Sequence, residues 1–198
     1  MSRRLLAGLG AAVLVLLAGC TGGSDGGSAA TASSSASAGL GSVRTDLQPC
    51  PEQPTTPAAD EKLPAISLPC FNGGTLDLAK APGVPMVVNL WASWCGPCRE
   101  ELPVVQQLAG AAGGKVRVVG VVSKDGKSQA ASFADDAGAT FPAAFDGQGE
   151  VMGALGLNTL PHTLFITADG SVSFVSFQPV RSLDEFEQLV SQHLGVQL

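Results

Sequence analysis

Two cysteines separated by a Gly-Pro pair are the residues of this chain with the clearest capacity for chemistry. Cys95 and Cys98 follow residues 86–92, an apolar run that predicts a buried strand, and they stand where a helix is expected to begin. This spacing puts the two sulfurs one helical turn apart, close enough for a reversible disulfide. At a helix N-terminus, unpaired backbone N–H groups and the positive end of the helix dipole stabilise a thiolate. We therefore expect Cys95 to be the nucleophile and Cys98 the resolving thiol.

Structural zinc sites use the same cysteine spacing, so the pair alone leaves two kinds of site open. The sequence holds no second Cys-x-x-Cys and no His-x-His that could complete four ligands. We therefore expect a redox-active disulfide, with no bound metal and no other cofactor.

The residues around the cysteines extend this pattern. The stretch WASWCGPCREELP, residues 91–103, and the stretch TLPHTLFI, residues 159–166, resemble the thioredoxin-like family, specifically its extracytoplasmic, membrane-tethered TlpA and ResA branch. The resemblance covers roughly residues 60–196. It implies an α/β thioredoxin fold, in which a central mixed β-sheet is flanked by helices and carries an N-terminal β-hairpin extension and a central insertion.

The resemblance also implies roles for residues on both sides of the cysteine pair. Pro161 is expected to form a cis peptide bond beside the disulfide, and the backbone of Leu160 to pair with a substrate peptide. Trp94, Gly96 and Pro97 are expected to contact the same substrate.

Glu101 is the acidic residue with a predicted catalytic role. It follows Cys98 by three positions on the expected helix, so it can share the helix face near the sulfurs. In ResA-like proteins a glutamate at this place tunes thiol acidity and moves protons. Thioredoxin usually carries a buried aspartate in its central strand, where this chain has Asn89, and that departure favours Glu101 as the substitute. The alternative is a solvated glutamate in the second helical turn, as we expect for Glu100.

The start of the chain has the features of a secretory leader that ends in a lipidation site. Arg3 and Arg4 precede an apolar run at 5–19, which is short for a membrane span and is followed by Cys20. Small residues before this cysteine resemble the bacterial lipoprotein cleavage box, so we expect a signal peptide at 1–19 and a lipid anchor on Cys20. An uncleaved anchor helix is the alternative. Either arrangement attaches an extracytoplasmic domain to the cell membrane.

The stretch after the leader, residues 20–60, is expected to be a flexible tether, followed by one thioredoxin-like domain at 61–198. Residues 21–45 are mostly Gly, Ser, Ala and Thr, which bury too little apolar surface to order a backbone. Cys50 and Cys70 remain once the lipidated cysteine and the active pair are assigned, and an oxidising compartment would join them in a structural disulfide. A second redox pair or a metal site is the alternative for these two residues.

Hydrophobic periodicity and turn residues predict the elements that position these groups. We expect strands at 65–68, 75–78, 86–92, 116–122, 141–146, 163–167 and 171–177, and helices at 96–112, 127–137, 150–155 and 183–194. Ser182 begins a capping box for the last helix. We expect a surface position for His162 and an edge position on the final helix for His193.

The composition is that of an acidic globular domain. Apolar residues make up 45% of the 198 residues and the formal net charge is -6. Loss of the arginines in the leader would make the remaining chain more acidic still. An acidic surface argues against a nucleic acid partner. We expect a monomer whose partners are protein dithiol or disulfide substrates, an unidentified membrane electron donor and, through the anchor, the lipid bilayer.

Together these features predict a membrane-tethered thiol-disulfide oxidoreductase that reduces protein disulfides. By resemblance, its clients would be apocytochrome c thiols or a copper-centre assembly factor. An extracytoplasmic oxidase that forms disulfides is the alternative among enzymes. A copper-binding module that uses Cys95 and Cys98 as thiolate ligands is the alternative from another class. Against it, Met86 and Met152 are the only methionines outside the leader, and neither adjoins the pair.

Overall fold

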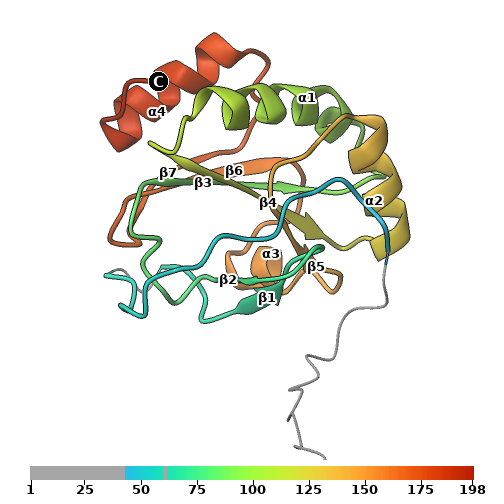
Figure 1. Cartoon of the computed structure of the whole chain (residues 1–198), viewed down its shortest axis with the longest axis horizontal. Helices are drawn as coiled ribbons and strands as arrows, with labels where there is room; N and C mark the ends of the chain where they lie inside the picture. The colour runs from blue at the N-terminus through green and yellow to red at the C-terminus, as the bar shows by residue number, and fades with distance from the viewer. Residues whose placement is uncertain (1–42, 60–61) are drawn as a thin grey trace, which may run out of the picture. The chain divides into compact units, whose positions relative to one another are not determined.

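A five-stranded mixed sheet forms the centre of the computed structural model, which describes residues 43–59 and 62–198. Its order is β5-β4-β3-β6-β7, with β3, β4 and β5 parallel and β6 and β7 antiparallel (Figure 1). The strands are β3 (Met86–Trp91), β4 (Arg117–Ser123), β5 (Ala143–Asp146), β6 (His162–Ile166) and β7 (Val172–Ser176). This arrangement confirms the fold class predicted from the sequence.

Helices and a hairpin cover the two faces of the sheet. The helices are α1 (Gly96–Ala111), α2 (Lys127–Asp136), α3 (Glu150–Ala154) and α4 (Leu183–Leu194), and the hairpin pairs β1 (Ser67–Pro69) with β2 (Thr75–Asp77). Buried residues of α1, α2 and α4 belong to one apolar cluster, and those of α3 and the hairpin belong to the other. In Figure 1, α1 and α4 accordingly lie together on one side of the sheet, and α3 lies with β1 and β2 on the other.

Strand β3 is buried on both faces, as its continuous apolar sequence predicts. Val87 and Trp91 point into the cluster on the helix side, whereas Val88 and Leu90 point into the cluster on the hairpin side. The glycine that interrupts the apolar run of β4 has a steric cause, because a Cβ on Gly120 would lie 2.7 Å from the Trp91 indole nitrogen. The sheet therefore holds the end of β3 in a fixed position, and the Cys-x-x-Cys segment follows directly.

The last helix begins with a variant of the predicted capping box. The Ser182 hydroxyl accepts a hydrogen bond from the Glu185 backbone N–H at 3.2 Å. The Glu185 carboxylate accepts one in return, but from the backbone N–H of Arg181 at 2.9 Å, one residue earlier than the motif specifies. The two bonds thus give partners to the backbone N–H groups of Arg181 and Glu185 at the start of α4.

Residues 43–59, which the sequence analysis assigned to the tether, pack against the domain. Leu47 is fully buried, and Cys50 forms a disulfide with Cys70. The backbone N–H of Gln48 donates to Thr140, and that of Cys50 donates to Gly73. Polar backbone groups of this proline-rich segment thus find partners on the domain, and the boundary predicted at residue 60 lies too late.

The predicted signal peptide at 1–19, the lipidated Cys20 and the rest of the tether up to residue 42 lie outside the described residues. Over 43–59 and 62–198, none of the helices combines the length and the hydrophobicity needed to cross a bilayer.

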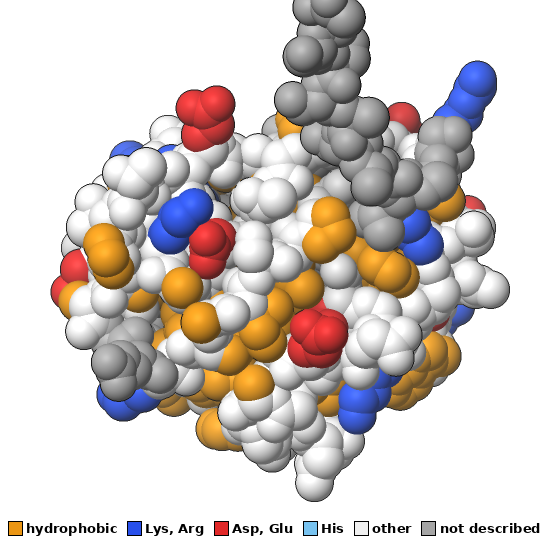
Figure 2. Space-filling view, turned by 90° about the horizontal axis from the view of Figure 1, so that it is seen from below, with side chains coloured by type: hydrophobic (Ala, Val, Ile, Leu, Met, Phe, Trp, Pro, Cys, Tyr) orange, Lys and Arg blue, Asp and Glu red, His pale blue; other side chains and the backbone are white. Residues whose placement is uncertain are grey.

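On the face seen from below in Figure 2, apolar side chains gather in the middle with single acidic and basic side chains among them.

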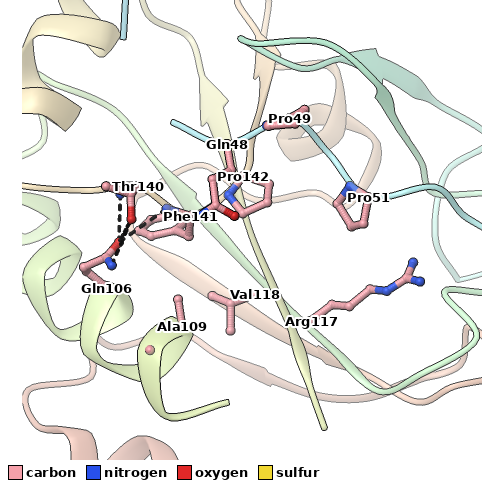
Figure 3. A pocket seen from close by; sticks show the side chains of 11 residues that line it. Gln48, Pro49, Pro51, Gln106, Ala109, Arg117, Val118, Thr140, Phe141 and Pro142 are labelled. Carbon is pink, nitrogen blue, oxygen red and sulfur yellow. Dashed lines mark hydrogen bonds between the residues drawn. The ribbon is translucent and has the colours of Figure 1, made fainter. Parts of the chain in front are cut away.

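A hollow of about 340 Å³ lies between the N-terminal segment, α1 and the start of β4 (Figure 3). Pro49 and Pro51 border it on one side. Arg117 and Val118, which also line it, begin β4, whereas the cysteines follow the end of the parallel strand β3. The Gln106 side chain in this hollow is occupied by hydrogen bonds to Thr140 and Phe141. The cysteine pair is therefore placed elsewhere, at the other end of the sheet.

Candidate active site

Cys95 and Cys98 form a disulfide at the start of α1. Their sulfurs are 2.05 Å apart and their Cα atoms 5.3 Å apart. Cys95 is the N-cap residue, with extended backbone, and its Sγ accepts a hydrogen bond from the Cys98 backbone N–H at 3.2 Å. Pro97 occupies the first turn, where a missing N–H leaves no hydrogen bond unmade. Once the disulfide is reduced, the same N–H and the helix dipole would stabilise a thiolate on Cys95.

The disulfide lies directly beneath the surface. Cys95 retains 4% of its possible exposure and Cys98 retains 1%. The residues on either side of Cys95, Trp94 and Gly96, are exposed, and so is Pro97. These three predicted substrate-contact residues are thus open to solvent around Cys95.

The loop between β4 and α2 braces the turn that leads into the cysteines. The Asp125 carboxylate accepts hydrogen bonds from the backbone N–H groups of Ser93, at 2.6 Å, and Gly126, at 2.8 Å. The Trp94 indole N–H donates to the backbone carbonyl of Lys124 at 2.8 Å. The sequence analysis did not identify this loop, because a Lys-Asp-Gly turn has no distinctive signal until its position next to β3 is known.

Arg99 adds a second brace on the same turn. Its guanidinium Nε donates to the Ser93 carbonyl at 3.1 Å and the group lies over the Phe133 ring, 4.8 Å from the ring centroid. The first turn of α1 is therefore held by α2 as well as by the loop between β4 and α2.

The bond between Leu160 and Pro161 is cis, as the resemblance implied. His162 follows at the start of β6 and pairs with Leu90 near the end of β3. This antiparallel register places the cis-proline at the same edge of the sheet as the turn that carries Cys95. Leu160 is half-buried and packs against both apolar clusters.

Glu101 is buried beneath the start of α1 and accepts two hydrogen bonds. Its Oε1 accepts from the Val180 backbone N–H at 2.8 Å, and its Oε2 accepts from Asn89 Nδ2 at 2.8 Å. The same amide donates to the Thr163 hydroxyl at 2.9 Å. The four residues come from α1, the loop before α4, β3 and β6, so the tertiary fold assembles this network.

Burial raises the pKa of Glu101 above its ordinary value, although the hydrogen bonds from Val180 and Asn89 favour the ionised form. At 1% exposure the side chain is not the solvated glutamate that the sequence left open as an alternative. Glu100 is the solvent-facing one, as expected, and pairs with Arg181 at 2.9 Å.

The Asn89 amide can serve both protonation states of Glu101. Within the described residues its Oδ1 is buried and has no hydrogen-bond partner. If the amide turned over, Oδ1 would accept a hydrogen bond from the O–H of a neutral Glu101, and the Thr163 hydroxyl would change from acceptor to donor. The network can therefore accommodate a carboxyl group that gains and loses a proton.

The expected surface position of His162 is wrong. The residue is 3% exposed, because β6 places it between β3 and β7 beside the cis-proline. Burial lowers the pKa of its imidazole, and its Nε2 lies 3.3 Å from the Thr159 hydroxyl. Its ring meets the ring of Phe177 edge to face, with centroids 5.3 Å apart. His193 does lie on the final helix, where it stacks on Phe174 at 4.0 Å.

Cys50 and Cys70 take no part in this site. Their disulfide joins the N-terminal segment to the residue after β1, and both cysteines belong to the apolar cluster on the hairpin side. Over residues 43–59 and 62–198, no group of three or more His, Cys, Asp or Glu side chains is placed to hold a metal ion.

Curated relatives carry names that match this geometry. Thiol-disulfide oxidoreductase ResA of Oceanobacillus iheyensis is 32% identical over 114 residues, 57% of this chain and 59% of that protein. The DsbE homolog of Paracoccus denitrificans, a thiol:disulfide interchange protein, is 36% identical over 99 residues, 50% of this chain and 52% of that protein. The chain thus spans between half and three fifths of the length of these relatives.

A solved structure has the same fold. The crystal structure of a secreted disulfide oxidoreductase of Mycobacterium tuberculosis, homologous to DsbE of Escherichia coli, is similar with a TM-score of 0.59 and 26% identity. The similarity covers 68% of this chain and 99% of that one. The sequence pattern that defines the Redoxin family matches residues 58–190, more than half of the chain. A disulfide at a helix start, a cis-proline at the same end of the sheet and this match together show that the chain belongs to the Redoxin family, as a thioredoxin-like protein of the TlpA and ResA type.

Proposed function

We propose that this chain is an extracytoplasmic thiol-disulfide oxidoreductase that reduces protein disulfides through Cys95 and Cys98. The observation that carries the proposal is the position of this pair, with Cys95 as N-cap of α1 and its sulfur within 3.2 Å of a backbone N–H. The names of the ResA and DsbE relatives support the same chemistry.

The reaction begins with both cysteines reduced. The Cys95 thiolate attacks one sulfur of a client disulfide, which forms a mixed disulfide and releases the other client sulfur as a thiolate. Cys98 loses its proton and attacks the Cys95 sulfur, which releases the second client thiol and leaves the Cys95–Cys98 disulfide. Two electrons pass from the chain to the client, and a dithiol donor must return them for the next cycle.

Glu101 and its partners support the second step in this proposal. Cys98 is buried and must lose a proton before it attacks, and Glu101, three residues along α1, is the nearest acid in the helix sequence that is also buried. A carboxylate whose pKa is raised by burial can accept a proton near neutral pH more readily than an exposed one. The Asn89 amide donates a hydrogen bond to this carboxylate, and a turned amide would accept one from the protonated form.

The location of the protein is part of the proposal. A lipid on Cys20 would attach the chain to the cell membrane after removal of residues 1–19, and a monomer on a flexible tether would reach clients and a membrane electron donor. Apocytochrome c thiols and copper-centre assembly factors are the proposed client classes, by resemblance to the TlpA and ResA branch. Replacement of Cys20 by Ala should release the protein to the medium or leave it unprocessed, and membrane retention of a cleaved form without lipid would contradict the anchor.

The chemistry is tested with insulin disulfides as substrate. Cys95→Ser should abolish their reduction, and Cys98→Ser should accumulate mixed disulfides between Cys95 and the client. A double variant with Ala at Cys50 and Cys70 serves as control and should retain reduction, because that disulfide lies outside the site. Full activity of Cys95→Ser would disprove the assignment of the nucleophile.

The direction of electron flow is tested by the equilibrium reduction potential of the Cys95–Cys98 couple. A potential of about -270 mV, as in thioredoxin, would support the reductase proposed here. A potential of about -120 mV would assign the protein to the disulfide-forming oxidases instead.

A further inference from the structure

Two large apolar side chains stand out as exposed in the part of the chain that the structure describes. Trp94 and Phe177 are each 61% exposed. Single exposed aromatic residues are common on protein surfaces and need no special account. Their positions relative to the disulfide are what call for one.

Both side chains lie at the edge of the sheet that carries the active site. Trp94 directly precedes Cys95. Phe177 directly follows β7, and the register that pairs Ser176 with Thr163 on β6 brings it alongside His162, the residue after the cis-proline. Two segments far apart in the sequence therefore each supply one exposed aromatic side chain to this end of the sheet: Trp94 next to the disulfide and Phe177 next to the residue after the cis-proline.

Each of the two rings is held in place before any client binds. The Trp94 indole N–H donates to the Lys124 carbonyl at 2.8 Å. The Phe177 ring packs edge to face on the buried His162, with ring centroids 5.3 Å apart and planes at 77°. Val180, in the same loop as Phe177, donates its backbone N–H to the Glu101 carboxylate. Aromatic groups ordered in this way lose little conformational entropy on binding, which favours their use as anchors.

Several charged groups near these rings already have partners. Glu100 on α1 pairs with Arg181 in the loop before α4 at 2.9 Å, and the Arg99 guanidinium donates to the Ser93 carbonyl and lies over the Phe133 ring. The Asp125 carboxylate is occupied by two backbone N–H groups. Apolar side chains of a client would thus meet two exposed aromatic rings.

We propose that Trp94 and Phe177 form a pair of aromatic anchors for an extended client segment with apolar side chains on both sides of its cysteine, and that Phe177 is a specificity-determining residue. This inference rests on the proposed function, in which a client sulfur reaches Cys95, the residue that follows Trp94. Trp94 would contact the client segment on one side of its cysteine, and Phe177 would contact it on the other side. His162 is then a positioning residue for Phe177.

Two synthetic peptide disulfides test this selectivity with the full-length, reduced chain. Each is a homodimer joined through one cysteine, which is flanked by leucines in the first peptide and by serines in the second. In each reaction the chain gives two electrons to the peptide disulfide and becomes oxidised, releasing two peptide thiols. The measurement is the second-order rate constant for each peptide, and its ratio, leucine peptide over serine peptide, reports the apolar contribution.

We expect Phe177→Ala to lower this ratio about tenfold, which corresponds to about 1.4 kcal/mol of binding energy and is typical for loss of one aromatic anchor. Phe177→Leu should keep most of the ratio, because it keeps an apolar side chain. Gln178→Ala, next in the chain and also exposed, is the matched control and should leave the ratio at the wild-type value.

The outcomes separate this inference from the function on which it rests. If the wild-type chain reduces neither peptide, the proposed function itself fails. If it reduces both, and Phe177→Ala leaves the ratio unchanged or Gln178→Ala lowers it equally, the anchor role of Phe177 is wrong. Sedimentation at the assay concentration tests a second copy as occupant, since a dimer that dissociates in Phe177→Ala would assign this surface to self-association and overturn the proposal.

Discussion

Replacing Glu101 by Gln tests the buried carboxylate at the centre of the candidate site. The folded chain encloses this side chain at 1% exposure, and the two carboxylate oxygens accept hydrogen bonds from Val180 and Asn89, each at 2.8 Å. Desolvation raises the pKa of Glu101 from its ordinary value of 4.5. The perturbation removes the charge and keeps the size of the side chain.

The sign of the effect on stability follows from the raised pKa. Between pH 4.5 and the raised pKa of Glu101, the folded chain binds more protons at this site than the unfolded chain. The free energy of unfolding therefore falls as pH rises through this window, with a slope of at most about 1.4 kcal/mol per pH unit for one group. Above the raised pKa the contribution no longer changes. Gln does not titrate, so the variant lacks this slope.

Hydrogen bonding sets the constant part of the difference in unfolding free energy between Glu101→Gln and the wild type. A Gln side chain has one acceptor, so its amide nitrogen would face one of the two N–H donors that now serve the carboxylate. Loss of a bond to a charged group costs about 1.5–3 kcal/mol. Asn89 can offset part of this cost, because a turned amide would present its unpartnered Oδ1 to the Gln nitrogen.

Urea unfolding of the oxidised chain, at intervals from pH 4.5 to 8, measures the prediction. The difference in unfolding free energy, Glu101→Gln minus wild type, should rise with pH and then level off. Glu100→Gln is the matched control, because its carboxylate is 69% exposed and its surface ion pair contributes little. A difference for Glu101→Gln that stays constant or falls with pH would refute the reasoning.

Three further changes test the supports of the site. Removal of the distal disulfide, with Ala at Cys50 and Cys70, should lower the free energy of unfolding by about 3 kcal/mol for a separation of 20 residues, as measured in urea. Asp125→Ala should lower it by about 1–2 kcal/mol and slow insulin reduction, because the Ser93 N–H loses its acceptor; an unchanged rate would argue against the brace. Gly120→Ala should cost about 1–3 kcal/mol, seen as a lower thermal midpoint, since its Cβ would lie 2.7 Å from an indole nitrogen; unaltered stability would contradict that contact.

Local features of the sequence were sufficient for the order of strands and helices and for the reactive pair, whereas the fold class came from the resemblance. The unbroken apolar run at 86–92 identifies a strand buried on both faces, and the Cys-x-x-Cys with its Pro97 identifies the start of a helix. The strand and helix order followed, because each element is encoded by the periodicity and turn residues of its own segment. The cis bond before Pro161 came from the resemblance rather than from local physics.

Contacts between distant segments decided the surroundings of that pair. Glu101 could have been solvated or buried until Asn89 and Val180 were brought against it, across separations of 12 and 79 residues. His162 and Phe177 illustrate the same limit. Only the register of β6 against β3 and β7 buries His162 and leaves the Phe177 ring exposed beside it. A hydrogen bond between residues far apart in the chain leaves no pattern in either segment alone, so only the tertiary structure could establish it.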